Sequence, residues 1–396
     1  MNGNGPPFAV PLVLLLSVAL LFLFFPEILS PLRPLPPQSQ ISPADELDDL
    51  ALLTRASSGG GASHLSSSSN KLKIAFLFLT NSDLHFAPLW QKFFRNRRSL
   101  FSIYVHADPS VNVTPPGGVF DGRFIPSKRT SRASPTLISA TRRLLAAALL
   151  DDPANAYFAL LSQYCVPLHS FDYVYGSLIT NPKFDLSDTP ESISHGVRLS
   201  YRSYIEILEE SKSLWKRYTA RGRFAMLPEV QFDQFRVGSQ FFVLTRRHAL
   251  TVVRDRRLWR KFRLPCYGEL KSACYPEEHY FPTLLSMKDP EGCTRYTLTR
   301  VNWTDSVGGH PRTYGPTEVS SELIQELRLS NNSGSYLFAR KFSPDSPKPL
   351  MKIADKANER STEIVEFWVD YIRVVFGKSG LGEALSVPTD HEAQEP

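Results

Sequence analysis

The sequence predicts an α/β fold with a Rossmann-type parallel sheet, and three short runs are the main reason. Residues 73–79, 101–106 and 157–161 are predominantly apolar and bounded by polar or turn-forming residues, which is typical of strands buried on both faces. Helical patterns separate these runs, and alternation at this spacing favours parallel strands joined by helices. Ligands of such sheets bind at the carboxyl ends of the strands.

Two helices are expected between these strands. The first covers residues 86–94, where five apolar side chains recur at helical spacing. The second begins at Pro135, because Ser134 is a favoured N-cap residue and proline is favoured in the first helical position. Apolar residues then continue on one face through Leu150.

An apolar run of 18 residues, 8–25, follows a short segment, 1–7. As a helix it would be about 27 Å long, close to the thickness of a bilayer core. The competing interpretation is a cleaved signal peptide, but no Lys or Arg precedes the run and no small-x-small site follows Phe25. We therefore expect a transmembrane signal-anchor at 8–25 with residues 1–7 as a cytoplasmic tail.

The rest of the chain divides by composition. Residues 26–70 are rich in Pro, Ser and Gly and lack the apolar content to pack, which predicts a flexible stem. Residues 381–396 are polar and acidic, which predicts a disordered tail. Between them we expect a folded domain at 71–380, since 42% hydrophobic residues and 26 Phe allow a sizeable core.

Charge argues weakly against a nucleic-acid partner. The net charge is +6, and basic residues are spread through the folded part. The densest basic segment, 254–263, is interpreted as a solvated helix face, with an acidic glycan or lipid head group as the alternative ligand. Glycosylation sequons at Asn112, Asn302 and Asn331 favour a lumenal domain.

The four cysteines all lie in the predicted folded domain. An even number behind a membrane segment is compatible with two disulfides in an oxidising lumen, in any of three connectivities, and buried free thiols are the alternative. Three of them surround an acidic motif, so a bridge there would pin that loop. The four are Cys165, Cys266, Cys274 and Cys293.

The acidic motif places two glutamates at a predicted helix start. Pro276 precedes Glu277 and Glu278, and apolar residues follow at helical spacing. The two acids could simply complement the helix dipole. Adjacent helical residues point about 100° apart, so they cannot easily flank one bond as a glycosidase pair. A single carboxylate acting as a base remains a candidate.

No metal site is predicted. His279 has no His-x-x-x-His or Cys-x-x-Cys partner, so a packed or hydrogen-bonded histidine is expected. The Asp-x-Asp pair that usually holds a metal–diphosphate in sugar-nucleotide enzymes is absent from the sequence. Asp108, at the end of a predicted strand, is a lone candidate for a substrate contact, and ordering a turn is the alternative.

Isolated cations are the candidate anion ligands. Arg312 lies in a glycine-bearing turn, and Lys341 follows a strand-like segment, 336–339. Arginine offers phosphate oxygens a planar fork, and lysine offers a compact charge. Each, taken separately, could also be a surface cation.

Several blocks together resemble the core-2/I-branching N-acetylglucosaminyltransferase family (glycosyltransferase family 14), most closely its plant branch. The resemblance runs in order over about residues 73 to 345. The blocks are Ile74 to Thr80, Tyr104 to Asp108, Leu160 to Leu168, Arg236 to Leu244, Cys274 to Thr283, and Val301 to Phe342.

The resemblance implies a GT-A-like nucleotide-sugar fold in a single-pass type II Golgi membrane protein with a lumenal catalytic domain. It also implies inverting transfer from a UDP-sugar without a metal cofactor. The catalytic base of the family falls on Glu278, and its diphosphate-binding residues fall on Arg312 and Lys341. The matching blocks also contain the candidate substrate contacts Asp108, Gly238, Ser239 and Trp303.

We therefore expect an enzyme that transfers N-acetylglucosamine, glucuronic acid or xylose to a glycan hydroxyl. Family resemblance suggests acceptors in cell-wall glycoproteins or polysaccharides. The alternative is a catalytically inactive, membrane-anchored glycan-binding or scaffolding protein. A lumenal hydrolase would need a second carboxylate facing Glu278, and no motif supports one.

Overall fold

The computed structural model describes residues 41–59, 71–180, 202–267 and 274–356, apart from residues 212, 305, 307, 308 and 333. The predicted anchor, 8–25, and the predicted tail, 381–396, lie outside the described residues. Among the helices in the described ranges, none is both long and apolar enough to span a bilayer.

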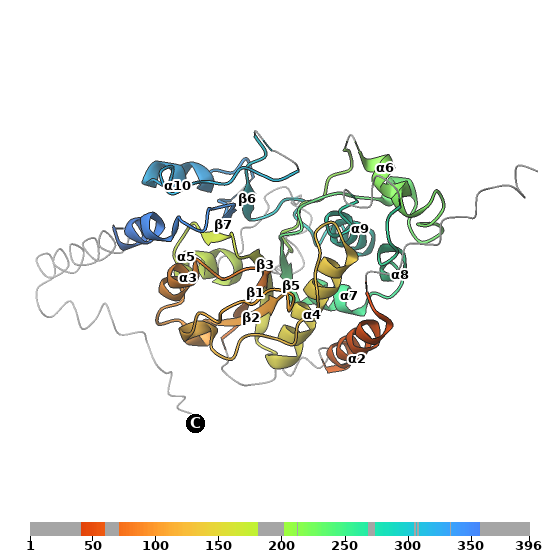
Figure 1. Cartoon of the computed structure of the whole chain (residues 1–396), viewed down its shortest axis with the longest axis horizontal. Helices are drawn as coiled ribbons and strands as arrows, with labels where there is room; N and C mark the ends of the chain where they lie inside the picture. The colour runs from red at the N-terminus through yellow and green to blue at the C-terminus, as the bar shows by residue number, and fades with distance from the viewer. Residues whose placement is uncertain are drawn as a thin grey trace, which may run out of the picture.

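A four-stranded sheet forms the centre of the fold, in the order β2-β1-β3-β5 (Figure 1). The first three strands are parallel, as predicted, whereas β5 runs antiparallel to β3 and was not predicted. The strands are β1 (Lys73–Thr80), β2 (Phe101–Ala107), β3 (Asn155–Ser162) and β5 (Val243–Thr245).

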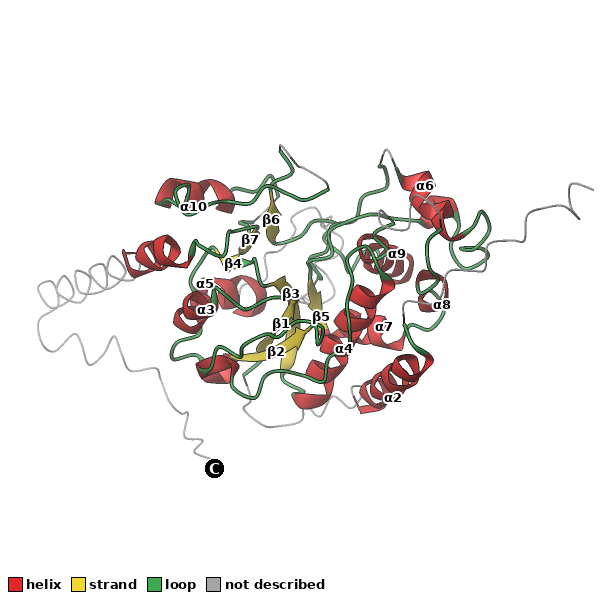
Figure 2. Ribbon diagram, viewed as in Figure 1, coloured by secondary structure: helices red, strands yellow, loops and turns green. Residues whose placement is uncertain are grey.

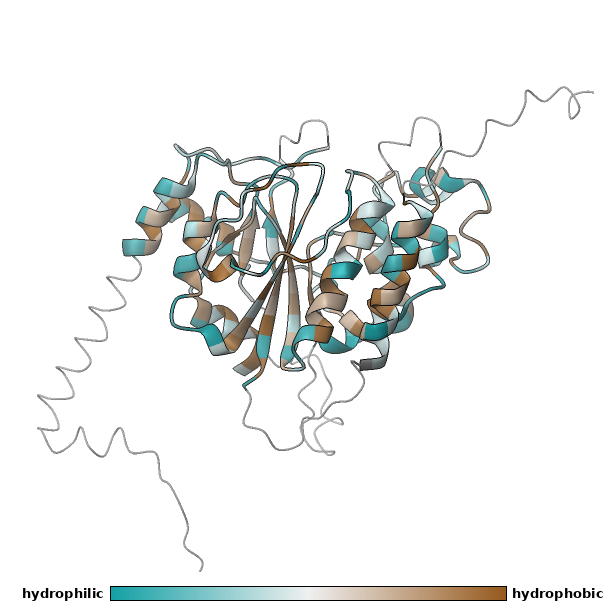
Figure 3. Ribbon diagram, turned by 60° about the horizontal axis from the view of Figure 1, so that its bottom comes forward, coloured by the Kyte–Doolittle hydropathy of each residue, from teal (hydrophilic) through white to brown (hydrophobic). Residues whose placement is uncertain are grey.

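Alternate residues of β1 enter two different cores, because successive side chains of a strand point to opposite faces. Ile74, Phe76 and Phe78 pack in one core, and Ala75, Leu77 and Leu79 pack in the other. Apolar strands consequently lie between helices on both sides (Figure 3). This double burial explains why the strand sequences are continuous apolar runs.

Helices cover both faces of this sheet (Figures 1 and 2). On one side lie α3 (Ala87–Phe93) and α5 (Phe171–Tyr175). On the other lie α4 (Pro135–Asp151), α7 (Arg246–Arg254) and α9 (Glu277–Lys288). The predicted start of α4 is confirmed, since the Ser134 side chain accepts a hydrogen bond from the N–H of Thr136.

A second, three-stranded sheet lies beyond the carboxyl end of β3 and has the order β4-β7-β6. Its strand β7 ends at Arg340, next to Lys341, so this sheet brings two cations to the edge where ligands are expected. The fold also contains β4 (Val166–Pro167), β6 (Thr299–Val301), β7 (Phe338–Arg340), α6 (Leu214–Tyr218), α8 (Trp259–Phe262) and α10 (Ser321–Arg328). The protein is thus a mixed α/β fold.

The flexible-stem prediction is wrong for residues 43–59, which form helix α2 (Pro43–Gly59). Leu53 and Ala56 are buried in the core shared with α4 and α7. Spacing of these few apolar residues, rather than overall composition, lets one face of the helix pack.

The basic segment 254–263 is likewise not simply a solvated helix face. Three of its five arginines contact helix α2. Arg254 donates to the carbonyl oxygen of Ser57 at 3.0 Å, and Arg256 donates to the hydroxyl of Thr54 at 3.1 Å. Arg263 forms an ion pair with Glu46.

One disulfide, Cys266–Cys274, is present, and Cys165 and Cys293 are buried free thiols. The two alternatives considered from the sequence were disulfides and buried free thiols, and each is correct for one pair of cysteines. The bridge ends at Cys274, directly before Tyr275, so it restrains the chain segment that leads into α9.

Candidate active site

Two adjacent glutamates begin helix α9, as the sequence predicted. Pro276 precedes the first turn, and side chains such as Phe281 and Leu285 bury the helix in the core. Unpaired N–H groups at a helix start favour negative charge nearby. Because helical neighbours point about 100° apart, the two carboxyl groups enter different surroundings.

Glu277 points into the protein and is only 3% exposed. Its Oε1 accepts a hydrogen bond of 3.2 Å from the N–H of Ala133, and its buried Oε2 has no partner among the described residues. Burial, with a further contribution from the charge of Glu278, raises the pKa of Glu277 to about 8. Glu277 is therefore mostly neutral near pH 7.

Glu278 faces a cavity, with 28% of its side chain exposed. Its Oε2 accepts a hydrogen bond of 2.9 Å from Arg217. Burial raises the pKa of Glu278 above its usual value, although Arg217, Arg132 and Arg340 oppose the change. A carboxylate with a raised pKa is a stronger base, so Glu278 is suited to accept a proton.

Glu278 lies in the wall shared by two adjoining cavities. The first, of about 340 Å³, is named the cationic cavity because Arg132, Arg340 and Lys341 line it. The second, of about 330 Å³, is named the Glu206 cavity after a half-buried acid that lines it. The described residues common to both are Gln240, Phe241, Tyr275, Glu278, Trp303, Gly309 and Arg340.

The cationic cavity opens at the carboxyl end of the main sheet. Residues 79–81, at the end of β1, and residues 162–164, at the end of β3, line it. This is the edge at which the sequence predicted ligand binding.

Aromatic rings hold the three cations in place. The guanidinium of Arg340 lies 4.2 Å from the ring centre of Phe241, and Lys341 Nζ lies 4.9 Å from that of Tyr164. Arg132 donates to the hydroxyl of Tyr275 at 3.0 Å and to the carbonyl of Gly309 at 2.9 Å.

The cations also influence one another. Burial, followed by the charges of Arg340 and Arg132, lowers the pKa of Lys341. The same three cations contribute to lowering the pKa of His310, after burial. Positive charge held together in this way favours an anionic ligand.

Residues 74–328, more than half of the chain, match the Core-2/I-branching enzyme family. The protein belongs to this family. It is 29% identical to Glycosyltransferase BC10 of Oryza sativa subsp. japonica, in a match that covers 71% of this chain and 76% of that relative. The protein is therefore a glycosyltransferase.

Several predicted site residues of this Core-2/I-branching enzyme line the two cavities. Lys341 lines the cationic cavity, Gly238 and Ser239 line the Glu206 cavity, and Trp303, 56% exposed, lines both. A Cβ on Gly238 would lie 1.9 Å from the carbonyl oxygen of Glu206. Close approach of two backbone segments therefore explains the glycine.

Arg312 is the main departure from the predicted site. It is exposed, its Nη2 lies 2.5 Å from Glu318 Oε1, and its guanidinium lies 5.6 Å from the ring centre of Tyr314. It does not line either cavity. In the Core-2/I-branching enzyme, Arg132 and Arg340 line the cationic cavity together with Lys341.

Asp108 lines neither cavity. It orders the backbone, and this role was the alternative considered from the sequence. Oδ1 accepts hydrogen bonds from the N–H and hydroxyl of Ser110, and Oδ2 accepts them from the N–H and hydroxyl of Thr130. Burial alone would raise the pKa of Asp108, but these hydrogen bonds outweigh it and lower the pKa.

Sequence reasoning missed Arg132, Arg217, Arg340 and Glu206. Burial raises the pKa of Glu206, and the charge of Glu278 contributes to this rise. Arg340 could have been noticed, because it precedes Lys341 at the end of a strand. Arg132 and Arg217 carry no local signal, since each belongs to an irregular or short segment of ordinary composition.

His279 is hydrogen-bonded, as expected. Its Nδ1 lies 2.8 Å from the carbonyl oxygen of Arg236, and its ring stacks on Phe235. Burial lowers its pKa to about 3, so the ring stays neutral. Among the described residues, no three His, Cys, Asp or Glu side chains gather as metal ligands do.

The three sequons differ in their surroundings. Asn112 and Asn331 are exposed. Asn302 is half-buried, and its amide donates to the hydroxyl of Tyr314 at 3.1 Å. Use of these sites by a glycosylation enzyme stays a prediction.

Proposed function

We propose that this glycosyltransferase transfers a sugar from a UDP-sugar to a glycan hydroxyl with inversion and without a metal cofactor. One observation carries the proposal: Glu278 lies in the wall shared by a cavity lined by three cations and a second cavity of similar volume, which we assign to the acceptor. The candidate donors carry N-acetylglucosamine, glucuronic acid or xylose. The acceptor is proposed to be a cell-wall glycoprotein or polysaccharide.

In the proposed step, Glu278 removes the proton from the acceptor hydroxyl. The oxygen of that hydroxyl attacks the anomeric carbon of the donor sugar at the same time. The bond from that carbon to the diphosphate oxygen breaks, and its electron pair leaves with UDP. Attack from the face opposite the leaving group inverts the configuration. Glu278 then releases the proton to solvent.

Side-chain cations are proposed to stabilise the departing diphosphate. Arg132, Arg340 and Lys341 are held before the substrate arrives, by aromatic rings or by the contacts of Arg132 with Tyr275 and Gly309. Preorganised charge aimed at a leaving group lowers the barrier because little reorganisation is needed during reaction.

A Golgi location with a lumenal catalytic domain is part of the proposal. The apolar run at 8–25 and the sequons support it. The Cys266–Cys274 disulfide also supports an oxidising compartment.

A donor screen with the purified full-length protein and EDTA tests the proposal. We expect UDP release from one donor with chelator present, and Glu278→Gln should lower kcat by about 100- to 10,000-fold. The substitution keeps size and polarity, so an unchanged melting temperature would separate loss of the base from unfolding. Activity that requires added manganese would contradict the metal-free mechanism. UDP binding without turnover of any donor would favour the inactive scaffold.

A further inference from the structure

The segment of residues 126–133 connects helix α2 to the cationic cavity. It begins beside α2 and α4 and ends one residue before Ser134, the N-cap of α4. Side chains of α2, α4, β2 and α9, and Asp108 just after β2, contact it at successive points. Its Arg132 reaches into the cavity that we propose binds the UDP diphosphate.

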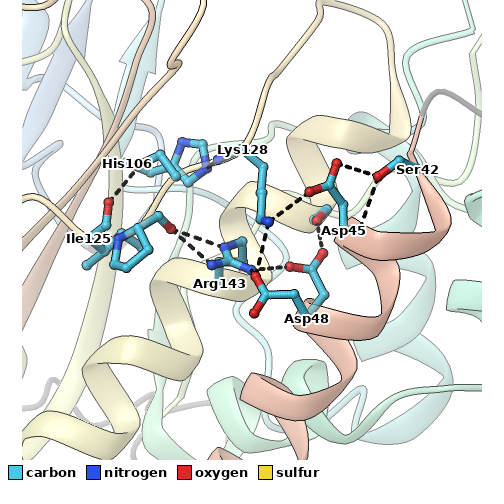
Figure 4. Close-up of polar contacts among 11 residues, drawn as sticks. Ser42, Asp45, Asp48, His106, Ile125, Lys128 and Arg143 are labelled. Atoms are coloured by element: carbon cyan, nitrogen blue, oxygen red, sulfur yellow. Dashed lines mark hydrogen bonds and ion pairs between the residues drawn. The ribbon is translucent and has the colours of Figure 1, made fainter.

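Arg143 of α4 joins the first part of this segment to α2 (Figure 4). Its guanidinium is buried, with 5% of the side chain exposed, and Nη1 lies 2.5 Å from Asp49 and 3.0 Å from Asp48. From its other edge, Nη2 donates to the carbonyl oxygen of Pro126 at 3.1 Å. A planar guanidinium can bind two partners at fixed angles, so α2 and Pro126 are held in one geometry.

Lys128 makes a second connection to α2 (Figure 4). Its Nζ lies 2.8 Å from Asp45 and 3.2 Å from Asp48. Its main-chain N–H donates to Nε2 of the buried His106 at 3.1 Å. Burial lowers the pKa of His106 to about 4, so this nitrogen remains an acceptor at neutral pH.

The end of the segment is anchored at the active site. Asp108 binds the N–H and hydroxyl of Thr130, and Glu277 accepts from the N–H of Ala133. Arg132 lies between these two anchors and contacts Tyr275 and Gly309. A displacement of the main chain at Lys128 would therefore reach Arg132 through a short, restrained piece of backbone.

We propose that helix α2 is a positioning element for donor binding, and that Lys128 transmits its docking to Arg132. The inference rests on the proposed role of Arg132 in the diphosphate site. Two acids of α2 neutralise Lys128 and hold it away from the cations of the cavity. Fixing the segment in advance reduces the ordering cost when UDP binds.

A double-mutant cycle on the full-length protein tests this inference, with the Kd of UDP measured by calorimetry. Lys128→Ala should raise the Kd by about 3- to 10-fold and raise the KM for the donor, with kcat nearly unchanged. In an Arg132→Ala background, Lys128→Ala should have no further effect, because the residue that it positions is already missing. Pairing Lys128→Asp with Asp45→Lys should restore part of the affinity.

Lys73→Ala is the matched control. Lys73 forms an ion pair with Asp152 of 2.8 Å at similar exposure, 26% against 30% for Lys128, and lies at the start of β1. Its removal should leave the Kd unchanged. Asp45→Asn is a second variant, which removes the nearer of the two α2 charges that Lys128 contacts and leaves Asp48 in place.

The outcomes separate the inference from the proposed function. If Arg132→Ala does not weaken UDP binding, the proposed diphosphate site is wrong. If Arg132→Ala weakens binding but Lys128→Ala and Asp45→Asn do not, or if Lys128→Ala acts equally in both backgrounds, the positioning role of α2 is wrong.

Discussion

The N–H of Gly238 donates a hydrogen bond of 2.9 Å to the carbonyl oxygen of Glu278. This contact holds the Gly238 segment against the first turn of α9. Arg236 adds two contacts nearby, with its N–H donating to the Thr283 hydroxyl and its carbonyl lying near His279 Nδ1. The position of Glu278 therefore depends on a neighbouring backbone segment as well as on its own helix.

Gly238→Ala should disturb this arrangement. The added methyl group would lie 1.9 Å from the carbonyl oxygen of Glu206, so one backbone segment must move. We expect a loss of about 1–3 kcal/mol in the free energy of unfolding and a lower kcat/KM, measured by denaturant unfolding and donor turnover. Gly176→Ala is the control, since nothing lies within 4 Å of its Cβ position. Equal effects of the two substitutions would contradict the close-approach explanation.

Lys341→Ala and Arg340→Ala should weaken UDP binding by about 10- to 100-fold each, because each removes a charged side chain that we propose binds the diphosphate. Calorimetry with UDP measures this directly. Arg312→Ala is the matched control, since Arg312 lies outside both cavities and pairs with Glu318. If Arg312→Ala loses as much affinity for UDP as Lys341→Ala, Arg312 binds the diphosphate, as the sequence predicted.

Glu277 should make the protein less stable as pH rises. Its pKa is about 8 in the folded protein, above the usual value of 4.5. A raised pKa means that the folded state binds more protons, so this stabilisation is complete below the unfolded pKa and is lost as pH rises through about 8. Its contribution to the slope is at most about 1.4 kcal/mol per pH unit.

Glu277→Gln removes this titration and keeps an acceptor for the N–H of Ala133. The variant should therefore show a flatter dependence of unfolding free energy on pH between about 5 and 8, measured by denaturant unfolding at several pH values. An unchanged slope would mean that Glu277 is ionised in the folded protein at neutral pH.

Removal of α2 should destabilise the catalytic domain. A protein beginning at Asn70 would expose the site that buries Leu53 and Ala56 and would leave Arg143 without Asp48 and Asp49. Loss of one side of a buried ion pair costs about 3–5 kcal/mol. Thermal unfolding should show a clear fall in melting temperature relative to a protein beginning at Ile41, and equal melting temperatures would contradict the packing role of α2.

Prediction succeeded where neighbouring residues decide the structure. The three parallel strands followed from continuous apolar runs, and the start of α4 followed from Ser134 and Pro135. The first turn of α9 with Glu277 and Glu278 was also visible. Composition misled the prediction at 43–59, because a few well-spaced apolar residues suffice when a domain offers a complementary surface.

The site was only partly predictable. Glu278 and Lys341, both expected from the sequence, line the cationic cavity, whereas Arg312, expected from its glycine-bearing turn and from the family resemblance, lines neither cavity. The catalytic and binding roles of all three stay predictions. Arg132 and Arg340 line the cationic cavity instead. Nothing in the local sequence distinguishes a cation that converges on a cavity from one that pairs with a surface acid such as Glu318.

The sequence alone determined the alternating strands and helices and the two acids at one helix start, because these depend on periodicity and capping over a few residues. Tertiary structure decided which of the acids is buried, which cations surround the other, and where α2 binds. The physical reason is that burial and charge are set by segments far apart in the chain. Their effects on pKa and ligand binding appear only when those segments are packed together.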